Sequence, residues 1–213
     1  VMTVGVLFMG FAVAALVQAD LGTERIVVVQ PTTYGLDNSC QLDAMATFGD
    51  TARGVVVIDP NAQPEELARL TELGVRGARF HMLPGGAVPW DMLEAVAANI
   101  APFGWHIQLR LGGRELPGRL DRLLRLPVGI VVDHVGRFMP AVEPDAAEFG
   151  SLLTMVDHGA IVKLSAPYES SETGPPGFDD VTRLVDVLTT RAPDRLVWAS
   201  NWPHPGQAAP PTT

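Results

Sequence analysis

The chain has few of the residues that form disulfides or bind metal ions. Its single cysteine, Cys40, excludes an internal disulfide and a cysteine-based zinc site, and we interpret it as a small apolar helix residue. None of the five histidines stands in a His-x-His pair, the spacing that offers two imidazoles to one metal ion. We therefore expect no metal or other cofactor, with a divalent metal such as zinc as the alternative. The scarcity of cysteine favours a reducing compartment, and we predict a cytoplasmic protein.

Positive charge is also scarce. The chain has 15 Lys and Arg against 24 Asp and Glu, which gives a formal net charge of −9. A nucleic-acid partner would need a basic surface, and a stable partnership with an anionic membrane is disfavoured for the same reason. The negative net charge does not exclude a small anionic substrate, because a few local arginines can reverse the electrostatic field inside a cleft. Charged residues make up 18% and hydrophobic residues 47%, so we expect an ordered chain with a large core.

The N-terminal 19 residues form an atypical apolar stretch, without charge from Val1 to Val17. The stretch fits the core of a signal peptide, with Val-Gln-Ala19 as a loose cleavage site, but it lacks the basic residues that precede such a core. The favoured interpretation is a first helix from about Gly10 to Leu21. The chain begins with Val rather than Met, which leaves its true start open, and we predict a disordered tail over 205–213.

After Gly22, apolar runs suited to buried parallel strands alternate with amphipathic helical patterns. This alternation predicts βα units joined by right-handed crossovers, in one domain that spans residues 1–213. We predict an α/β fold, a (β/α)8 TIM barrel that is truncated or divergent, because about seven strands are recognisable and a closed barrel has about eight. The predicted strands are Ile26–Val29, Gly54–Ile58, Val75–Phe80, His106–Leu111, Val128–Val132, Ile161–Leu164 and Leu196–Ala199.

Four segments together carry a resemblance to a known family. They are Gln30-Pro-Thr-Thr-Tyr-Gly-Leu-Asp-Asn38, the apolar run that ends in Asp133-His134, Lys163-Leu-Ser-Ala-Pro-Tyr168 and Trp198-Ala-Ser-Asn-Trp-Pro-His204. Over about residues 20–206 the chain resembles the amidohydrolase-2 family, in particular its branch of 2-pyrone-4,6-dicarboxylate lactonases and related lactone hydrolases. The resemblance implies that the unrecognised strand is the first, with Val4 to Phe8 as a substitute. An unclosed barrel would expose two strand edges, which a homo-oligomer could cover.

Strand periodicity places candidate binding residues on one face. Polar and apolar residues alternate from His106 to Arg110, so His106, Gln108 and Arg110 share a face that points inward. Arg110, nearest the strand tip, either binds substrate or is ion-paired inside the barrel. Arg79 and His81 stand two apart at the end of the preceding strand, where a guanidinium can grip a carboxylate. The alternative for Arg79 is a salt bridge to a neighbouring strand.

The resemblance also assigns catalytic positions. It makes His134 a hydrogen-bond donor to the reacting carbonyl or a metal ligand, and it places Asn201 where the family has a general-base aspartate. Hydrolysis of an ester needs a base to take a proton from water, and an amide side chain cannot do so near neutral pH. His204 or Asp133 could substitute, although nothing in the sequence favours either.

Three further residues are candidate substrate contacts: Tyr34, Tyr168 and Lys163. The alternative for Lys163 is a buried ion pair. With Arg79 and Arg110 as carboxylate-binding groups, the resemblance implies a hydrolase that acts on a lactone or cyclic ester of a carboxylated or sugar-acid substrate. Two alternatives stay open. One is an inactive binding domain that keeps the pocket without the base, and the other is a fragment whose product folds poorly.

Overall fold

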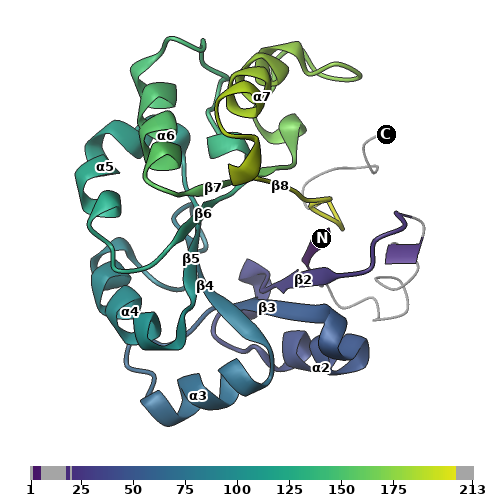
Figure 1. Ribbon diagram of the computed structural model, residues 1–213, viewed down its shortest axis with the longest axis vertical. Helices are drawn as coiled ribbons and strands as arrows, with labels where there is room; N and C mark the ends of the chain where they lie inside the picture. Colours follow the sequence, from purple (N-terminus) through teal and green to yellow (C-terminus); the bar gives the residue numbers. More distant parts are fainter. Residues whose placement is uncertain (1, 6–17, 20, 205–213) are drawn as a thin grey trace.

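The computed structural model describes residues 2–5, 18–19 and 21–204, and these form a single curved β-sheet covered by helices (Figure 1). The sheet has eight parallel strands in sequence order, and every recorded pairing joins consecutive strands. Such an unbroken order is typical of the singly wound barrel, whereas a doubly wound sheet reverses direction at a switch point. The strands are β1 Met2–Gly5, β2 Ile26–Val29, β3 Ala52–Val56, β4 Val75–His81, β5 His106–Arg110, β6 Ile130–Val132, β7 Ile161–Leu164 and β8 Leu196–Trp198.

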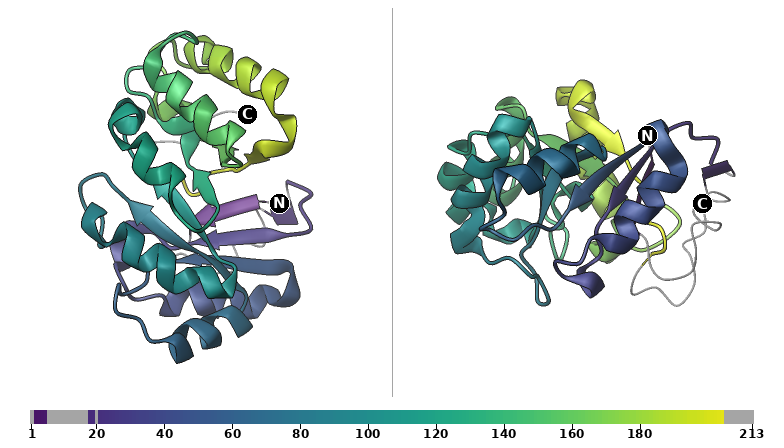
Figure 2. Two further views of the ribbon diagram at one scale, coloured as in Figure 1. Left: turned by 60° about the vertical axis from the view of Figure 1, so that its left-hand side comes forward. Right: turned by 90° about the horizontal axis from the view of Figure 1, so that it is seen from below.

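The helices lie on the outer side of the arc of strands in Figure 1. They are α2 Ser39–Phe48, α3 Pro64–Glu72, α4 Leu93–Ile100, α5 Leu116–Leu124, α6 Ala147–Asp157 and α7 Asp179–Arg191. Short 3-10 turns complete the connections: η1 Thr32–Tyr34, η2 Gly49–Thr51, η3 Trp90–Met92, η4 Ala101–Phe103, η5 Gly113–Glu115, η6 His134–Gly136, η7 Pro167–Glu169 and η8 Pro193–Arg195. Two further views show the earlier strands and helices in one half of the molecule and the later ones in the other (Figure 2).

The core fills the space between the sheet and these helices. Ile107 and Leu109 of β5 are fully buried, and so are Leu93 and Ile100 of α4 and Phe149 of α6. Burial of one such side chain contributes about 1.5–3 kcal/mol, so this layer holds the strands in place. The opposite face of each strand points to the interior of the arc, where the polar residues of β5 lie. No helix within the described ranges is both long and apolar enough to cross a membrane.

The predicted barrel-type fold is confirmed, with differences at strand ends. The runs at 26–29 and 161–164 coincide with β2 and β7, but β3 begins at Ala52, because Ala52 and Arg53 pair with Ile26 and Val27. The expected substitute strand at Val4–Phe8 is β1, shifted to Met2–Gly5 and paired in parallel with β2. Its predicted end at Phe8, most of the expected helix over 10–21 and the predicted tail over 205–213 lie outside the described residues.

Candidate functional site

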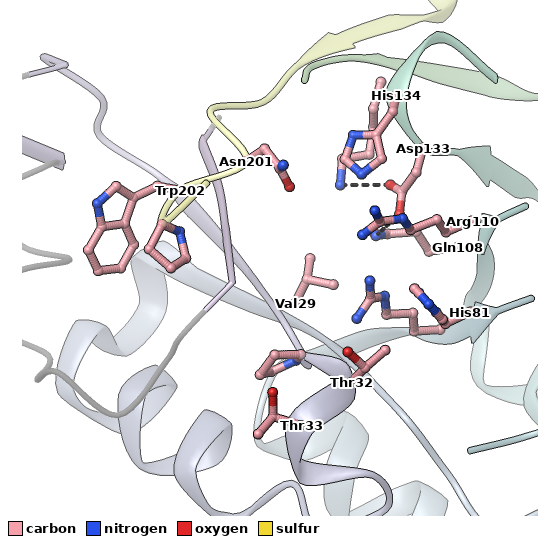
Figure 3. A pocket seen from close by; sticks show the side chains of 14 residues that line it. Val29, Thr32, Thr33, His81, Gln108, Arg110, Asp133, His134, Asn201 and Trp202 are labelled. Carbon is pink, nitrogen blue, oxygen red and sulfur yellow. Dashed lines mark hydrogen bonds and ion pairs between the residues drawn. The ribbon is translucent and has the colours of Figure 1, made fainter. Parts of the chain in front are cut away.

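A cavity of about 360 Å³ opens where the carboxyl ends of the strands meet (Figure 3). In a parallel barrel this end carries the loops that follow the strands, so side chains from distant parts of the chain converge there. The lining residues come from the ends of six strands and the turns after them: Val29, Pro31, Thr32, Thr33, Arg79, His81, Gln108, Arg110, Asp133, His134, Lys163, Asn201, Trp202 and Pro203.

Register explains why four of these side chains form one wall of the cavity. In the parallel ladder between β4 and β5, Arg79 is aligned with Gln108 and His81 with Arg110. Because side chains alternate along a strand, residues two apart share a face, and all four point into the cavity. His106 lies on the same face one step further from the tip, where it packs beside Gly77 and is mostly buried.

Positive charge dominates the lining of the cavity, although the whole protein is acidic. Arg79, Arg110 and Lys163 face a single lining carboxylate, Asp133. Arg79 is 8% exposed and donates through Nη1 to the backbone oxygen of Gln30, while its buried Nε has no hydrogen-bond partner among the described residues. Burial lowers the pKa of Arg79, yet a guanidinium remains charged at any physiological pH. The arrangement suits an anionic ligand, whose charge would compensate the excess.

The Asp133 carboxylate is already engaged. Its Oδ1 lies 2.9 Å from Nζ of Lys163, and its Oδ2 accepts a hydrogen bond of 3.2 Å from Nε2 of Gln108. Burial raises the pKa of Asp133, but the nearby positive charge, foremost that of Lys163, outweighs burial and holds it well below its usual range. A carboxylate held in this way is a weak base, so Asp133 is poorly suited to take a proton from water.

Both Asp133 and His134 line the cavity, although adjacent residues of a regular strand point to opposite faces. Strand β6 ends at Val132, and the backbone then turns sharply, with φ of 56° at His134 and 53° at Val135. This left-handed region is unfavourable for non-glycine residues, above all for a β-branched one, and such strain concentrates at functional sites. The turn is what brings the second side chain inward.

His134 is a buried, neutral imidazole with polar groups beside both ring nitrogens. Its Nδ1 lies 2.8 Å from Oγ of Ser165, and its Nε2 lies 4.0 Å from Oε1 of Glu169. Burial lowers the pKa of His134 to about 4, an effect that Asp133 and Glu169 only partly offset. The pKa of His81 is also lowered to about 4, by burial and by the charges of Arg79 and Arg110. Near neutral pH both rings are therefore uncharged hydrogen-bonding groups.

Glu169 is a functional candidate that sequence reasoning missed. Its Oε2 accepts hydrogen bonds from Nη2 of Arg110 at 2.6 Å and from Nε of Arg137 at 3.0 Å. Arg110 thus lines the cavity and is ion-paired at the same time, so the expected ion pair is present and substrate binding by Arg110 stays a prediction. The available signal was the position of Glu169 in the turn after β7, directly after Tyr168.

Asn201 reaches the cavity from the turn after β8, with a left-handed φ of 55°. Its Nδ2 donates a 2.8 Å hydrogen bond to Oη of Tyr168, which in turn lies 3.2 Å from Nδ1 of His204. Tyr168 and His204 therefore lie behind Asn201 and are not lining residues. Tyr34 is not among them either, although its neighbours Thr32 and Thr33 are.

The donors of this cavity do not fit a divalent metal. Within the described part of the chain, no three or more His, Cys, Asp or Glu side chains come together in a way that could hold an ion. The single lining carboxylate is paired with Lys163, and two guanidinium groups would face the same ion. Cationic neighbours of this kind oppose metal binding, which calls for anionic or neutral oxygen and nitrogen ligands.

The chain is similar in sequence to known proteins. The model of the Amidohydro_2 family, amidohydrolase, matches residues 5–213. The chain is 35% identical to the D-galactarolactone isomerase of Agrobacterium fabrum, over 86% of this chain and 63% of that protein. It is 36% identical to a 2-pyrone-4,6-dicarboxylate hydrolase of Comamonas testosteroni, over 87% of this chain and 64% of the relative. The chain thus spans less than two thirds of the length of these curated relatives.

Solved structures show the same relationship. The apo crystal structure of ATU3138 from Agrobacterium tumefaciens superposes with a TM-score of 0.91 at 29% identity, covering 99% of this chain and 83% of that one. The likeness therefore extends over the whole curved sheet and its helices.

Proposed function

The chain belongs to the amidohydrolase family that matches it, as the sequence motifs predicted, and from this premise we propose that it acts on the ring ester of a carboxylated lactone. The observation that carries the proposal is the cavity itself, in which Arg79, Arg110 and Lys163 outnumber one engaged carboxylate. A small ligand with carboxylate groups would satisfy the buried Nε of Arg79, which lacks a partner among the described residues. Relatives named for lactone chemistry support the same substrate class.

In this proposal the two arginines bind the substrate, and the imidazoles of two histidines orient it. Arg79 and Arg110 hold the substrate carboxylate, and Lys163 adds positive charge to the lining of the cavity. His134 donates from Nε2 to the lactone carbonyl, because its Nδ1 is engaged with Ser165. His81, neutral between two arginines, offers a further hydrogen bond to the substrate.

The product depends on which nucleophile attacks the lactone carbonyl, water or a hydroxyl group of the substrate. The residue at position 201 affects which of the two can react. Attack by water needs a base, and Asn201 offers an amide where the family resemblance expects a carboxylate. Attack by a hydroxyl group of the substrate needs less help, because well-oriented intramolecular reactions reach effective molarities of about 10⁵–10⁸ M. The new C–O bond would form as the old ring C–O bond breaks, and the hydroxyl proton would pass to the released ring oxygen. Lactone isomerisation is therefore a second candidate beside hydrolysis, supported by Asn201 and by the relative named as an isomerase.

The test is to incubate the purified chain with aldarolactones and with 2-pyrone-4,6-dicarboxylate, and to follow the products by NMR. Ring-opened acid reports hydrolysis, and a new ring size reports isomerisation. We expect Asn201→Asp to raise hydrolysis by about tenfold or more, since it restores a carboxylate beside the reacting centre. A folded chain that binds these lactones but turns over none of them, with either residue at 201, would show a binding domain instead.

A further inference from the structure

The Asn201 amide has two ends with opposite hydrogen-bonding character, so the end that faces the cavity decides its chemistry. The nitrogen can only donate and the oxygen can only accept. One of the two N–H donors of Nδ2 is engaged by the protein, because Nδ2 donates to Oη of Tyr168 at 2.8 Å. Figure 3 shows the Asn201 side chain pointing into the cavity, with its oxygen on the side away from its backbone turn. The group presented to a ligand is therefore the acceptor, Oδ1.

Two hydrogen-bonding side chains behind Asn201 support this orientation. The phenolic oxygen of Tyr168 accepts from Asn201, and its own proton is donated to Nδ1 of His204, 3.2 Å away, when that ring carries its proton on Nε2. Burial lowers the pKa of His204, which favours the neutral ring that can accept a hydrogen bond. The two rings also meet edge to face, with centroids 6.0 Å apart and planes at 67°. The chain of donors runs from Asn201 through Tyr168 to His204.

We propose that Tyr168 is a positioning residue that holds Oδ1 of Asn201 toward the cavity, where it accepts a hydrogen bond from a hydroxyl group of the substrate. This inference rests on the proposed function and narrows its substrate class. An amide oxygen can orient a hydroxyl nucleophile but cannot remove its proton, so it suits a lactone that carries its own hydroxyl groups. The structure thus favours hydroxylated sugar-acid lactones over ring systems without a free hydroxyl.

The same short segment also positions two other cavity groups. Ser165 contacts His134, and Glu169 binds Arg110, while Tyr168 between them binds Asn201. These three cavity groups come from the ends of three different strands. One turn after β7 therefore sets the orientation of the carbonyl donor, an anion-binding guanidinium and the hydroxyl acceptor together.

A double-mutant cycle tests the orientation directly. In the wild-type background, Tyr168→Phe frees the amide to rotate, and we expect kcat on a hydroxylated lactone to fall by about tenfold with KM changed by less than about threefold. In the Asn201→Asp background both side-chain oxygens accept, so rotation costs nothing and Tyr168→Phe should change kcat by less than about threefold. An equal loss in both backgrounds would overturn the proposal, because Tyr168 would then act on something other than the amide.

A second measurement needs no turnover. With ¹⁵N-labelled asparagine, the side-chain signal of Asn201 is identified by its absence in Asn201→Asp, and Asn38, Asn61 and Asn99 serve as internal references. Tyr168→Phe should move the Asn201 signal alone, and an unmoved signal would overturn the proposed contact. If the signal moves but no lactone is turned over by either form, the proposed function fails while the orientation stands.

Labelling with fluorotyrosine tests the contact between Tyr168 and Asn201 without a mutation of Tyr168. The chain has two tyrosines, so the ¹⁹F spectrum holds two signals. Asn201→Asp should shift the signal of Tyr168 and leave that of Tyr34, which lies in the turn after β2, in place. A Tyr168 signal that is insensitive to residue 201 would count against the proposal even if Tyr168→Phe does not fold.

Discussion

The buried ion pair between Lys163 and Asp133 allows the most detailed stability prediction. Lys163 is the only lysine in the chain, and Lys163→Met removes its charge while keeping a flexible side chain of similar length. The change leaves the Asp133 carboxylate, 3% exposed, with the Gln108 amide 3.2 Å from its Oδ2. We expect the free energy of unfolding to fall by about 3–5 kcal/mol, the usual cost of leaving one buried charge without its partner.

The magnitude follows from the geometry. At the 2.9 Å separation of Nζ and Oδ1, the attraction is about 6 kcal/mol for an effective dielectric constant of about 20. Desolvation of the two ions costs several kcal/mol each, so the intact pair contributes little net stability. A double variant, Asp133→Leu with Lys163→Met, removes the attraction and both desolvation costs together. We therefore expect the double variant to be more stable than either single variant.

Urea unfolding followed by far-UV circular dichroism measures these differences. The matched control is Arg183→Met, which breaks the exposed ion pair with Glu143 and should cost less than about 1 kcal/mol. The reasoning is refuted if Lys163→Met costs no more than this control. It is also refuted if the two single losses simply add in the double variant, because the charges would then not be coupled.

Two further predictions concern binding and pH. Arg79→Met should weaken binding of a carboxylated lactone by about tenfold or more, measured by calorimetry at a temperature where the variant is folded; unchanged affinity would remove Arg79 from the site. Because the pKa of His134 falls from 6.5 to about 4 on folding, the unfolded chain binds that proton more tightly. Stability should therefore decline as the pH falls from about 6.5 to 4, by up to about 3 kcal/mol for this one group, and His134→Gln should flatten the slope in that window.

The periodicity of the strands was enough to predict much of the cavity wall. Alternation along β5 placed Gln108 and Arg110 on the inward face, and the spacing of Arg79 and His81 did the same for β4. These inferences succeed because a parallel strand covered by helices has only one face available for polar groups. Periodicity does not identify the partner of a side chain. It therefore left open whether Arg110 is bound by a carboxylate of the protein.

Contacts between distant turns could not be read from periodicity. The joint exposure of Asp133 and His134 to the cavity depends on left-handed backbone at two non-glycine residues, a conformation that local propensity disfavours. The role of Glu169 depends on two arginines that lie 59 and 32 residues away in sequence. Spacing within one strand carries no information on such contacts, since they arise from the order in which the strands close the arc.

The charge distribution adds a constraint on how an anionic substrate meets this site. The protein as a whole carries a formal charge of −9, so its surface repels an anion at long range. The residues Arg79 and Lys163 are 8% and 5% exposed, and their charges act only after the anion has entered the cavity. Added salt screens the surface repulsion more strongly than it screens buried charges. Binding should therefore depend less on salt than the number of cationic residues suggests, because salt relieves the repulsion at the surface while it weakens the attraction inside.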